Sequence, residues 1–333
     1  MHIVREVFPR AEIIDAALKF PITEFGWDVH VPRNTTFCNF EDPQYRLVIN
    51  LQDMLTSHHR DSKWPSELVK LENHFKKNNF PLEKIIVLLW PLGIKKDWPK
   101  DSFHLIEFSS HQYETWCSYK DAEEVLREAF APEHKQFEFN FVCPQRIYKP
   151  HRAALQNTLD PSIGNVSLQT KGIELAYPSL SVEEYDTTYD NLANLLAMRK
   201  NYNTALLTVV SESQYSEEYG IITEKTFNAI VAGTPFLMCA HRLALEHIRH
   251  NGFQTFNYIF DETYDELDNV VRMKDMVNSN WHFTQEPIST VEMQKIFEDC
   301  QGLINFNRDY FFDQFGNQLI DELRLDLLNL WGK

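Results

Sequence analysis

The chain has 333 residues, of which 43% are hydrophobic and 13% aromatic, and its formal net charge is −16 at pH 7. This length suggests two domains of ordinary size, and the apolar content is enough to build a core in each. The negative charge repels polyanions at long range, which argues against tight non-specific DNA binding.

The sequence also argues against several kinds of site. Only ten residues are glycine, and neither GxGxxG nor GxxxxGK[ST] occurs, so a glycine-rich phosphate loop is not expected. The cysteines form no CxxC pair, which indicates neither a zinc site nor a disulfide framework. They are Cys38, Cys117, Cys143, Cys239 and Cys300. We therefore expect no metal and no cofactor.

The first residues carry charges throughout, and no apolar run approaches the roughly 20 residues of a membrane span. No signal peptide and no membrane span are predicted. With scattered cysteines, this favours a reducing cytoplasm, which is the host cytoplasm if the protein is phage-encoded.

In the first part of the chain, apolar runs alternate with amphipathic stretches. Strands are predicted at 46–52, 84–90 and 104–108, and helices at 64–78 and 114–130. This alternation predicts an α/β protein, with a first Rossmann-like domain over residues 1–136 that ends in a linker at 131–135. Asp53 and Glu107 lie at the carboxyl ends of two predicted strands, where open α/β sheets bind ligands, so by position both are candidate catalytic bases.

A second Rossmann-like domain is predicted over residues 137–310. It opens with a strand at 137–142, a basic loop containing Arg146, Lys149 and His151, and a helix that starts at Arg152. A strand end, a basic loop and a helix start together favour an anion site, and the guanidinium of arginine can bind two phosphate oxygens at once. Further along, a helix at 242–250, a strand at 253–256 and helices at 261–277, 291–305 and 308–331 are expected.

The most informative stretch is residues 204–240. A β-branched apolar run at 205–210 predicts a buried strand, a polar loop follows at 211–220, and Thr223 can cap a short helix. Gly233 is suited to end that helix, and residues 236–240 read as the next strand. The stretch is therefore predicted to be a β-loop-α-β unit.

The first helical residues of this unit are Glu224 and Lys225. A cation at a helix N-terminus is unfavourable unless an anion binds beside it, and a neighbouring carboxylate can accept hydrogen bonds from two adjacent hydroxyls of a ribose. The pair therefore suits a nucleoside diphosphate, although an exposed ion pair at a helix start would look the same in sequence.

The segments VVSES at 209–213 and ITEKTFNAIVAGTPFLM at 222–238 resemble the nucleotide-sugar site of two-Rossmann-domain (GT-B) glycosyltransferases. The similarity is to the α1,3-fucosyltransferase type and to uncharacterised phage and bacterial relatives. Those relatives also contain a run similar to HNGFQTFNYIFDETYD at 250–265, so the resemblance covers residues 139–272.

The resemblance implies that Glu224 contacts the ribose of the donor and that Lys225 contacts its diphosphate. It also implies that Arg152 reaches the diphosphate, because the fucosyltransferases carry an arginine at the corresponding helix start. Arg146 and Thr223 complete the expected donor-binding set, and the last helix, 311–333, is expected by analogy to cross back to the first domain.

The expected activity is transfer of a sugar from a nucleotide sugar to the hydroxyl of a glycan or another acceptor, without a metal, because no DxD motif follows a strand of the second domain. Two alternatives stay open. One is a phage-type DNA glycosyltransferase acting on a hydroxymethylated base, for which DNA is the partner. The other is a non-catalytic protein that binds nucleotides or glycans.

Overall fold

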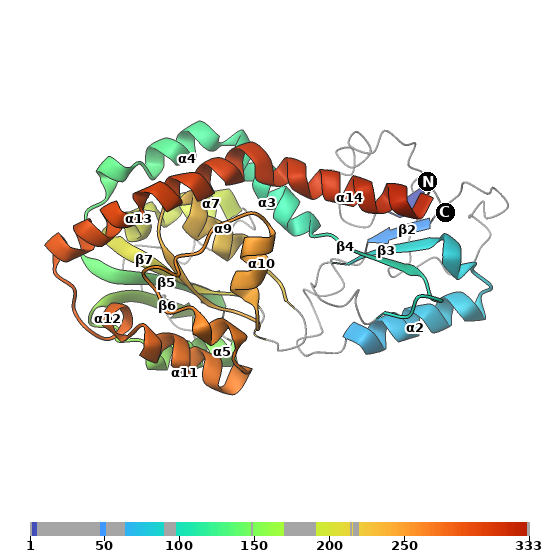
Figure 1. Ribbon diagram of the computed structural model, residues 1–333, viewed down its shortest axis with the longest axis horizontal. Coiled ribbons are helices and arrows are strands. Elements are labelled where there is room, and N and C mark those ends of the chain that lie inside the picture. The colour runs from blue at the N-terminus through green and yellow to red at the C-terminus, as the bar shows by residue number, and fades with distance from the viewer. Residues whose placement is uncertain are drawn as a thin grey trace. The chain divides into compact units, whose positions relative to one another are not determined.

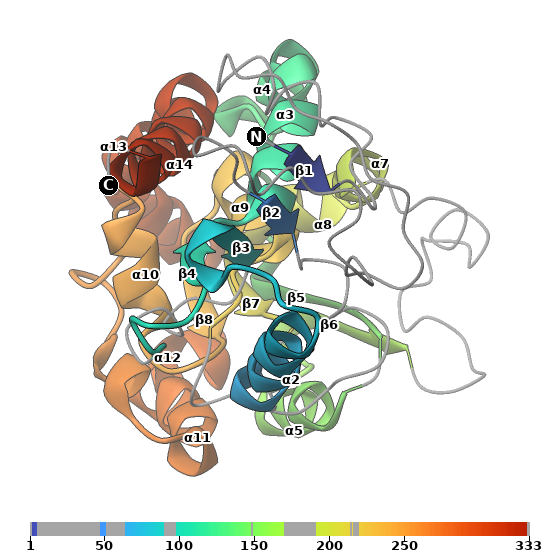
Figure 2. The ribbon, with the colours of Figure 1, turned by 90° about the vertical axis from the view of Figure 1, so that its right-hand side faces the viewer.

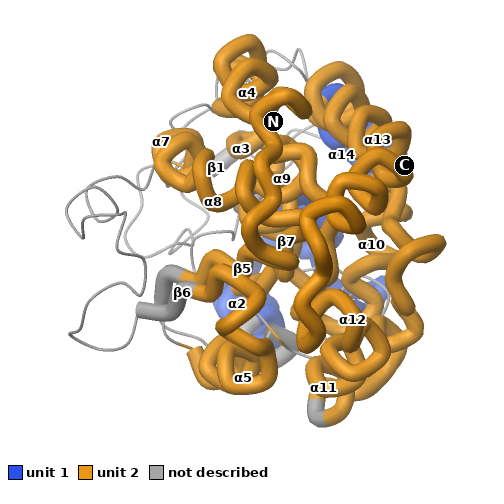
Figure 3. Tube along the Cα trace, turned by 90° about the vertical axis from the view of Figure 1, so that its left-hand side faces the viewer, with its two compact units in different colours: residues 1–111, 317–333 blue, residues 112–316 orange. Residues whose placement is uncertain are grey.

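The computed structural model describes residues 2–4, 47–50, 64–89, 98–147, 149–169, 191–213, 215 and 220–331. Within these residues the protein is a mixed α/β structure with two four-stranded sheets, whose neighbouring strands all pair in parallel (Figure 1). Two compact units divide the chain (Figure 3): unit 1 is residues 1–111 with 317–333, and unit 2 is residues 112–316. This division falls at 111 and 316, whereas the sequence suggested boundaries at 136 and 310.

The sheet of unit 1 has the spatial order β1-β2-β3-β4, which is also the order of the strands along the chain (Figure 2). Each side chain of β3 is buried, as expected for an inner strand of a parallel sheet. The predicted strands at 46–52, 84–90 and 104–108 and the predicted helix at 64–78 are confirmed. The elements are β1 His2–Val4, β2 Leu47–Asn50, α2 Trp64–Lys77, η2 Leu82–Lys84, β3 Ile85–Leu89, β4 His104–Glu107 and α14 Gly316–Trp331.

Unit 2 has helices on both faces of its sheet, α9 and α13 on one face and α5 and α11 on the other (Figure 1). The strands are β5 Phe139–Ile147, β6 Gly164–Gln169, β7 Ala205–Ser211 and β8 Phe236–Cys239. The helices are α3 Ser110–Asp121, α4 Glu123–Ala129, η4 Pro132–His134, α5 Pro150–Thr158, α7 Asn191–Ala197, α8 Arg199–Thr204, α9 Glu224–Val231, α10 Ala244–His250, η5 Thr263–Glu266, α11 Asn269–Ser279, α12 Trp281–Thr284, α13 Thr290–Tyr310 and the π-helical η6 Phe311–Phe315.

The strand order of unit 2 is β6-β5-β7-β8. The chain therefore steps from β5 to one side, to β6, and then crosses to the other side, to β7. In open α/β sheets such a reversal leaves a crevice at the carboxyl ends of the two central strands, and ligands bind there. In unit 2 this point lies between the ends of β5 and β7.

The strand predicted at 253–256 is wrong. The backbone N–H of Gln254 donates to Asn307 Oδ1 at 2.9 Å, and Asn307 Nδ2 donates to the Gln254 carbonyl at 2.8 Å. The Asn307 side chain thus supplies the backbone hydrogen-bond partners that a neighbouring strand would supply. Phe253 and Phe256 on either side of this contact are buried in the core.

Other boundaries also differ from the prediction. The expected helix at 261–277 begins only at Asn269, after the short η5, and the expected helix at 114–130 is two helices, α3 and α4. Strand β5 runs on to Ile147 because β6 pairs with it beyond the end of the β7 ladder at Val142. A proline such as Pro144 is tolerated where a strand has a ladder on only one side.

Three helices end near the amino edge of the unit 2 sheet, and two buried basic side chains donate hydrogen bonds to carbonyls at these helix ends. Lys135 Nζ donates to the carbonyls of Tyr202 at 3.1 Å and Ala232 at 3.0 Å, and Arg308 Nη1 donates to that of Phe130 at 3.3 Å. A positive charge is favourable at the negative end of a helix. Residues 131–135, predicted to be a linker, therefore belong to the packed structure of unit 2.

Candidate functional site

The candidate site lies at the carboxyl ends of β5 and β7. After β5, the chain enters α5 with Lys149, His151 and Arg152, and after β7 it turns through residues 211–213. All three basic side chains bond this turn. The polar groups after two neighbouring strands are thereby brought together at the point where the strand order reverses.

Arg152 is almost completely buried, with 2% of its surface exposed. Its Nη2 atom lies 3.4 Å from the carbonyl oxygens of both Ser211 and Glu212. Burial lowers the pKa of this guanidinium, and the carboxylates of Glu212 and Glu224 act in the opposite direction. The expected position at the start of α5 is confirmed, and Arg152 is a buried cation rather than a surface one.

Lys149 and His151 bind the same turn from the start of α5. Lys149 Nζ donates to the Ser213 carbonyl, and His151 Nε2 lies 3.1 Å from the Glu212 carbonyl. Burial lowers the pKa of His151 to about 4, so the imidazole is neutral at pH 7. The start of α5 therefore supplies two cations, Lys149 and Arg152, and one neutral donor, His151.

Helix α9 begins as the sequence predicts. Thr223 is its N-cap, and its hydroxyl accepts a hydrogen bond from the backbone N–H of Lys225. Phe227, Ile230 and Val231 are buried, and Gly233 adopts a left-handed conformation with φ of 61° just after the helix. The predicted cap, apolar face and stop signal of this helix are all confirmed.

Glu212 organises this helix start, and sequence reasoning missed it. Its carboxylate is fully buried. Oε1 accepts from the Thr223 N–H at 3.0 Å and from Thr226 Oγ1 at 2.7 Å, while Oε2 accepts from Thr223 Oγ1 at 2.5 Å and from the Ser213 N–H at 3.2 Å. A glutamate directly after an apolar strand and eleven residues before a threonine cap was the available signal.

The buried carboxylate changes the expected chemistry of the α9 N-terminus. The sequence suggested that free N–H groups there would hold a phosphate. In the structure, the positive pole of the helix already faces the carboxylate of Glu212. An anion at this site is therefore expected to bind mainly to side-chain cations rather than to the helix end.

Glu224 and Lys225 occupy the first two positions of α9 and form an ion pair. Lys225 Nζ also donates to Ser213 Oγ at 3.1 Å and to Thr223 Oγ1 at 3.3 Å. The side chains of Lys225 and Glu224 are 17% and 21% exposed, so a ligand can reach both. Among the described residues, three cations, Lys149, Arg152 and Lys225, thus surround one turn together with the carboxylates of Glu212 and Glu224.

Stacked side chains tie the loops after β5 and β7 to α11. The ring of Tyr215 lies parallel to His151 with 5.5 Å between centroids, and the Arg272 guanidinium lies 4.7 Å from the centre of the Tyr215 ring. Arg272 also donates twice to the Ala240 carbonyl just after β8. The ends of the three strands β5, β7 and β8 are connected in this way.

The remaining predicted residues lie elsewhere or outside the described part of the chain. Glu107 ends β4 in unit 1, where it is half-buried. Asp53 lies outside the described residues. Arg146 belongs to β5 rather than to the loop after it, and its side chain lies outside the described part of the structure. A catalytic base stays a prediction for both carboxylates.

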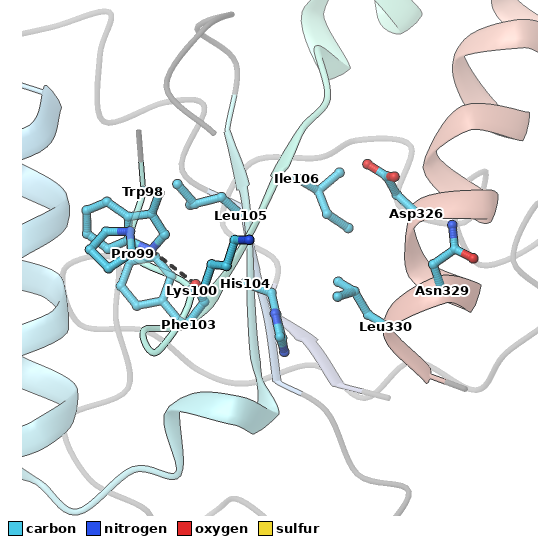
Figure 4. A pocket seen from close by; sticks show the side chains of 10 residues that line it. All are labelled: Trp98, Pro99, Lys100, Phe103, His104, Leu105, Ile106, Asp326, Asn329 and Leu330. Carbon is cyan, nitrogen blue, oxygen red and sulfur yellow. Dashed lines mark hydrogen bonds between the residues drawn. The ribbon is translucent and has the colours of Figure 1, made fainter. Parts of the chain in front are cut away.

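Unit 1 contains a separate small cavity beside β4 (Figure 4). Its volume is about 230 Å³, and Trp98, Phe103 and Ile106 line it together with Leu330 and Asp326 of α14. The Trp98 indole N–H donates to the Phe103 carbonyl at 3.1 Å, which fixes the ring as one wall. Pockets for drug-sized ligands have roughly 300–1,000 Å³, so this cavity is too small for a nucleotide sugar.

Within the described residues, no three histidine, cysteine or acidic side chains are grouped so as to hold a metal ion. None of the helices in that part of the chain is long and apolar enough to cross a membrane. No protein-family model, no curated protein and no solved structure matches the chain.

Proposed function

We propose that the protein is a metal-independent glycosyltransferase of the GT-B type, which moves a sugar from a nucleoside-diphosphate sugar to an acceptor hydroxyl. Unit 2 is the donor-binding domain in this proposal, and the first unit provides the acceptor side. The observation that carries the proposal is the meeting of Arg152, Lys149 and Lys225 around residues 211–213, at the point where the strand order reverses.

The chemistry of transfer explains why these residue types are needed. As the sugar leaves, negative charge builds on the diphosphate, and fixed positive groups that bind this charge lower the barrier. Arg152 is buried and held by two carbonyls, so it needs little reorganisation when the charge appears. Lys225 is more exposed, and in this proposal it binds the second phosphate.

Glu224 is proposed to accept hydrogen bonds from the ribose hydroxyls. Its carboxylate is adjacent to Lys225 at the start of α9, so ribose and diphosphate would be bound by consecutive residues. If the reaction inverts the configuration of the sugar, a base must deprotonate the acceptor, and Asp53 and Glu107 stay candidates for it by their positions in the sequence.

A thermal-shift panel of nucleoside diphosphates and nucleotide sugars tests the donor site. A ligand at 100 times its dissociation constant stabilises the folded protein by about 2.7 kcal/mol. We expect one nucleotide family to raise the melting temperature, and the corresponding nucleotide sugar to be slowly hydrolysed without an acceptor. If no nucleotide in the panel stabilises the wild-type protein, the proposed function is wrong.

A further inference from the structure

The ammonium group of Lys225 is fully hydrogen-bonded within the protein. A lysine has three N–H donors, and in Lys225 they face Ser213 Oγ at 3.1 Å, Thr223 Oγ1 at 3.3 Å and the carboxylate of Glu224. A ligand can therefore bind this cation only by replacing one of these partners.

Glu224 is the partner that a ligand can replace most easily. Thr223 is held by the buried carboxylate of Glu212, and Ser213 is fixed in the turn by its backbone N–H bond to the same carboxylate. Glu224, in contrast, is 21% exposed, and consecutive residues on a helix do not normally face each other. The Glu224 side chain takes no part in the hydrogen bonds between Glu212 and the helix cap, so displacing it from Lys225 leaves those bonds in place.

We infer that Glu224 is an internal competitor for the anion site, which an incoming diphosphate displaces from Lys225. This inference rests on the proposed function. Once displaced, the carboxylate is available to accept hydrogen bonds from two adjacent hydroxyls. A ligand with both a diphosphate and a ribose supplies new partners for Lys225 and for Glu224, whereas an anion without a ribose replaces only the partner of Lys225. Glu224 thereby makes the site selective for nucleoside diphosphates over simple polyphosphates.

The electrostatics of the neighbouring arginine agree with this competition. Burial lowers the pKa of the Arg152 guanidinium, and the carboxylates of Glu212 and Glu224 oppose this by favouring the charged form. One acidic side chain thus offsets two of the three cations of the site. Displacing or neutralising it strengthens the positive potential that buried Arg152 and partly exposed Lys225 together present to a phosphate.

Isothermal titration with inorganic pyrophosphate tests the inference directly. We expect Glu224→Gln, which keeps the volume of the side chain, to bind pyrophosphate about tenfold more tightly than the wild-type protein, since one charge-assisted bond to Lys225 no longer competes. The matched control is Glu246→Gln, which removes the same charge from the first turn of α10 and should change the affinity by less than about twofold.

A second titration tests the selectivity. Ribonucleoside diphosphates are compared with their 2′,3′-dideoxy counterparts, and the wild-type preference for the ribose should be smaller in Glu224→Gln, because a neutral amide oxygen accepts weaker hydrogen bonds than a carboxylate. If Glu224→Gln binds pyrophosphate no more tightly than the wild type, the inference is wrong, even if nucleotide sugars still stabilise the wild-type protein and so support the proposed function. If neither protein binds pyrophosphate, the inference is also overturned.

Discussion

The buried carboxylate of Glu212 gives the sharpest prediction about the stability of the site. The substitution Glu212→Ala removes the acceptor of four hydrogen bonds, from the N–H groups of Thr223 and Ser213 and from the hydroxyls of Thr223 and Thr226. It also removes the carboxylate that offsets the charge of buried Arg152. Breaking a buried charged network by removing one partner costs about 3–5 kcal/mol.

This cost can be converted into a melting temperature. Unit 2 spans residues 112–316, so it has the size for which 1 kcal/mol shifts the melting temperature by about 2–4 °C. We therefore expect Glu212→Ala to lower it by roughly 6–20 °C, measured by differential scanning calorimetry. The matched control is Thr226→Val, which removes only the 2.7 Å hydroxyl bond to Glu212 and should cost about 1 kcal/mol. If Glu212→Ala melts no lower than this control, the carboxylate does not hold the site together and the reasoning is refuted.

Three further predictions concern individual residues. Lys225→Ala and Arg152→Ala should each lower the rate of sugar transfer about a hundredfold or more in a turnover assay. Because the Arg152 side chain is 2% exposed, Arg152→Ala should also lower the free energy of unfolding by more than the roughly 1 kcal/mol of a surface charge. Wild-type turnover in either variant would show that the substituted residue does not belong to the donor site. The pKa of His151 is lowered from 6.5 to about 4, so the folded state favours the neutral ring. The contribution of His151 to the free energy of unfolding is therefore complete above pH 6.5 and is lost as the pH falls towards 4. Urea unfolding at pH 7 and pH 5 should therefore show a smaller acid-induced loss for His151→Gln than for the wild type, by about 1–2 kcal/mol, and equal losses would contradict the assignment. A Cβ at Gly220 would lie 2.0 Å from His241 Nε2, so Gly220→Ala should cost about 1–3 kcal/mol in the same urea experiment, and a wild-type midpoint would show that the imidazole can move aside.

Local signals in the sequence predicted the strand, cap, helix and stop of residues 204–240. Each depends on neighbours in the chain: the apolar run of β7, the hydroxyl of Thr223 and the left-handed conformation of Gly233. The position of Arg152 at the start of α5 was predictable for the same reason. Such features follow from propensity and capping alone.

Features that depend on partners distant in the chain were not predictable in this way. Strand β6 has only a short alternation of polar and apolar residues and exists because it pairs with β5. Residues 253–256 read as a strand, yet Asn307 takes the backbone partners of Gln254. The burial of Glu212 depends on a threonine cap that follows it after a ten-residue loop.

The buried lysine at the amino edge of the unit 2 sheet has a chemical consequence. Burial lowers the pKa of Lys135 to about 7, so at pH 8 its amine is mostly unprotonated and hence nucleophilic, while ordinary surface lysines remain charged. Its two carbonyl partners belong to the ends of α8 and α9, and only 9% of its surface is exposed, so a reagent in solution has little access to the amine. Acylation of Lys135 by an activated ester therefore requires the helix ends to separate, and its rate relative to free amine reports how often this edge of the protein opens. The acylation rate of Lys135 therefore measures local unfolding at the ends of α8 and α9.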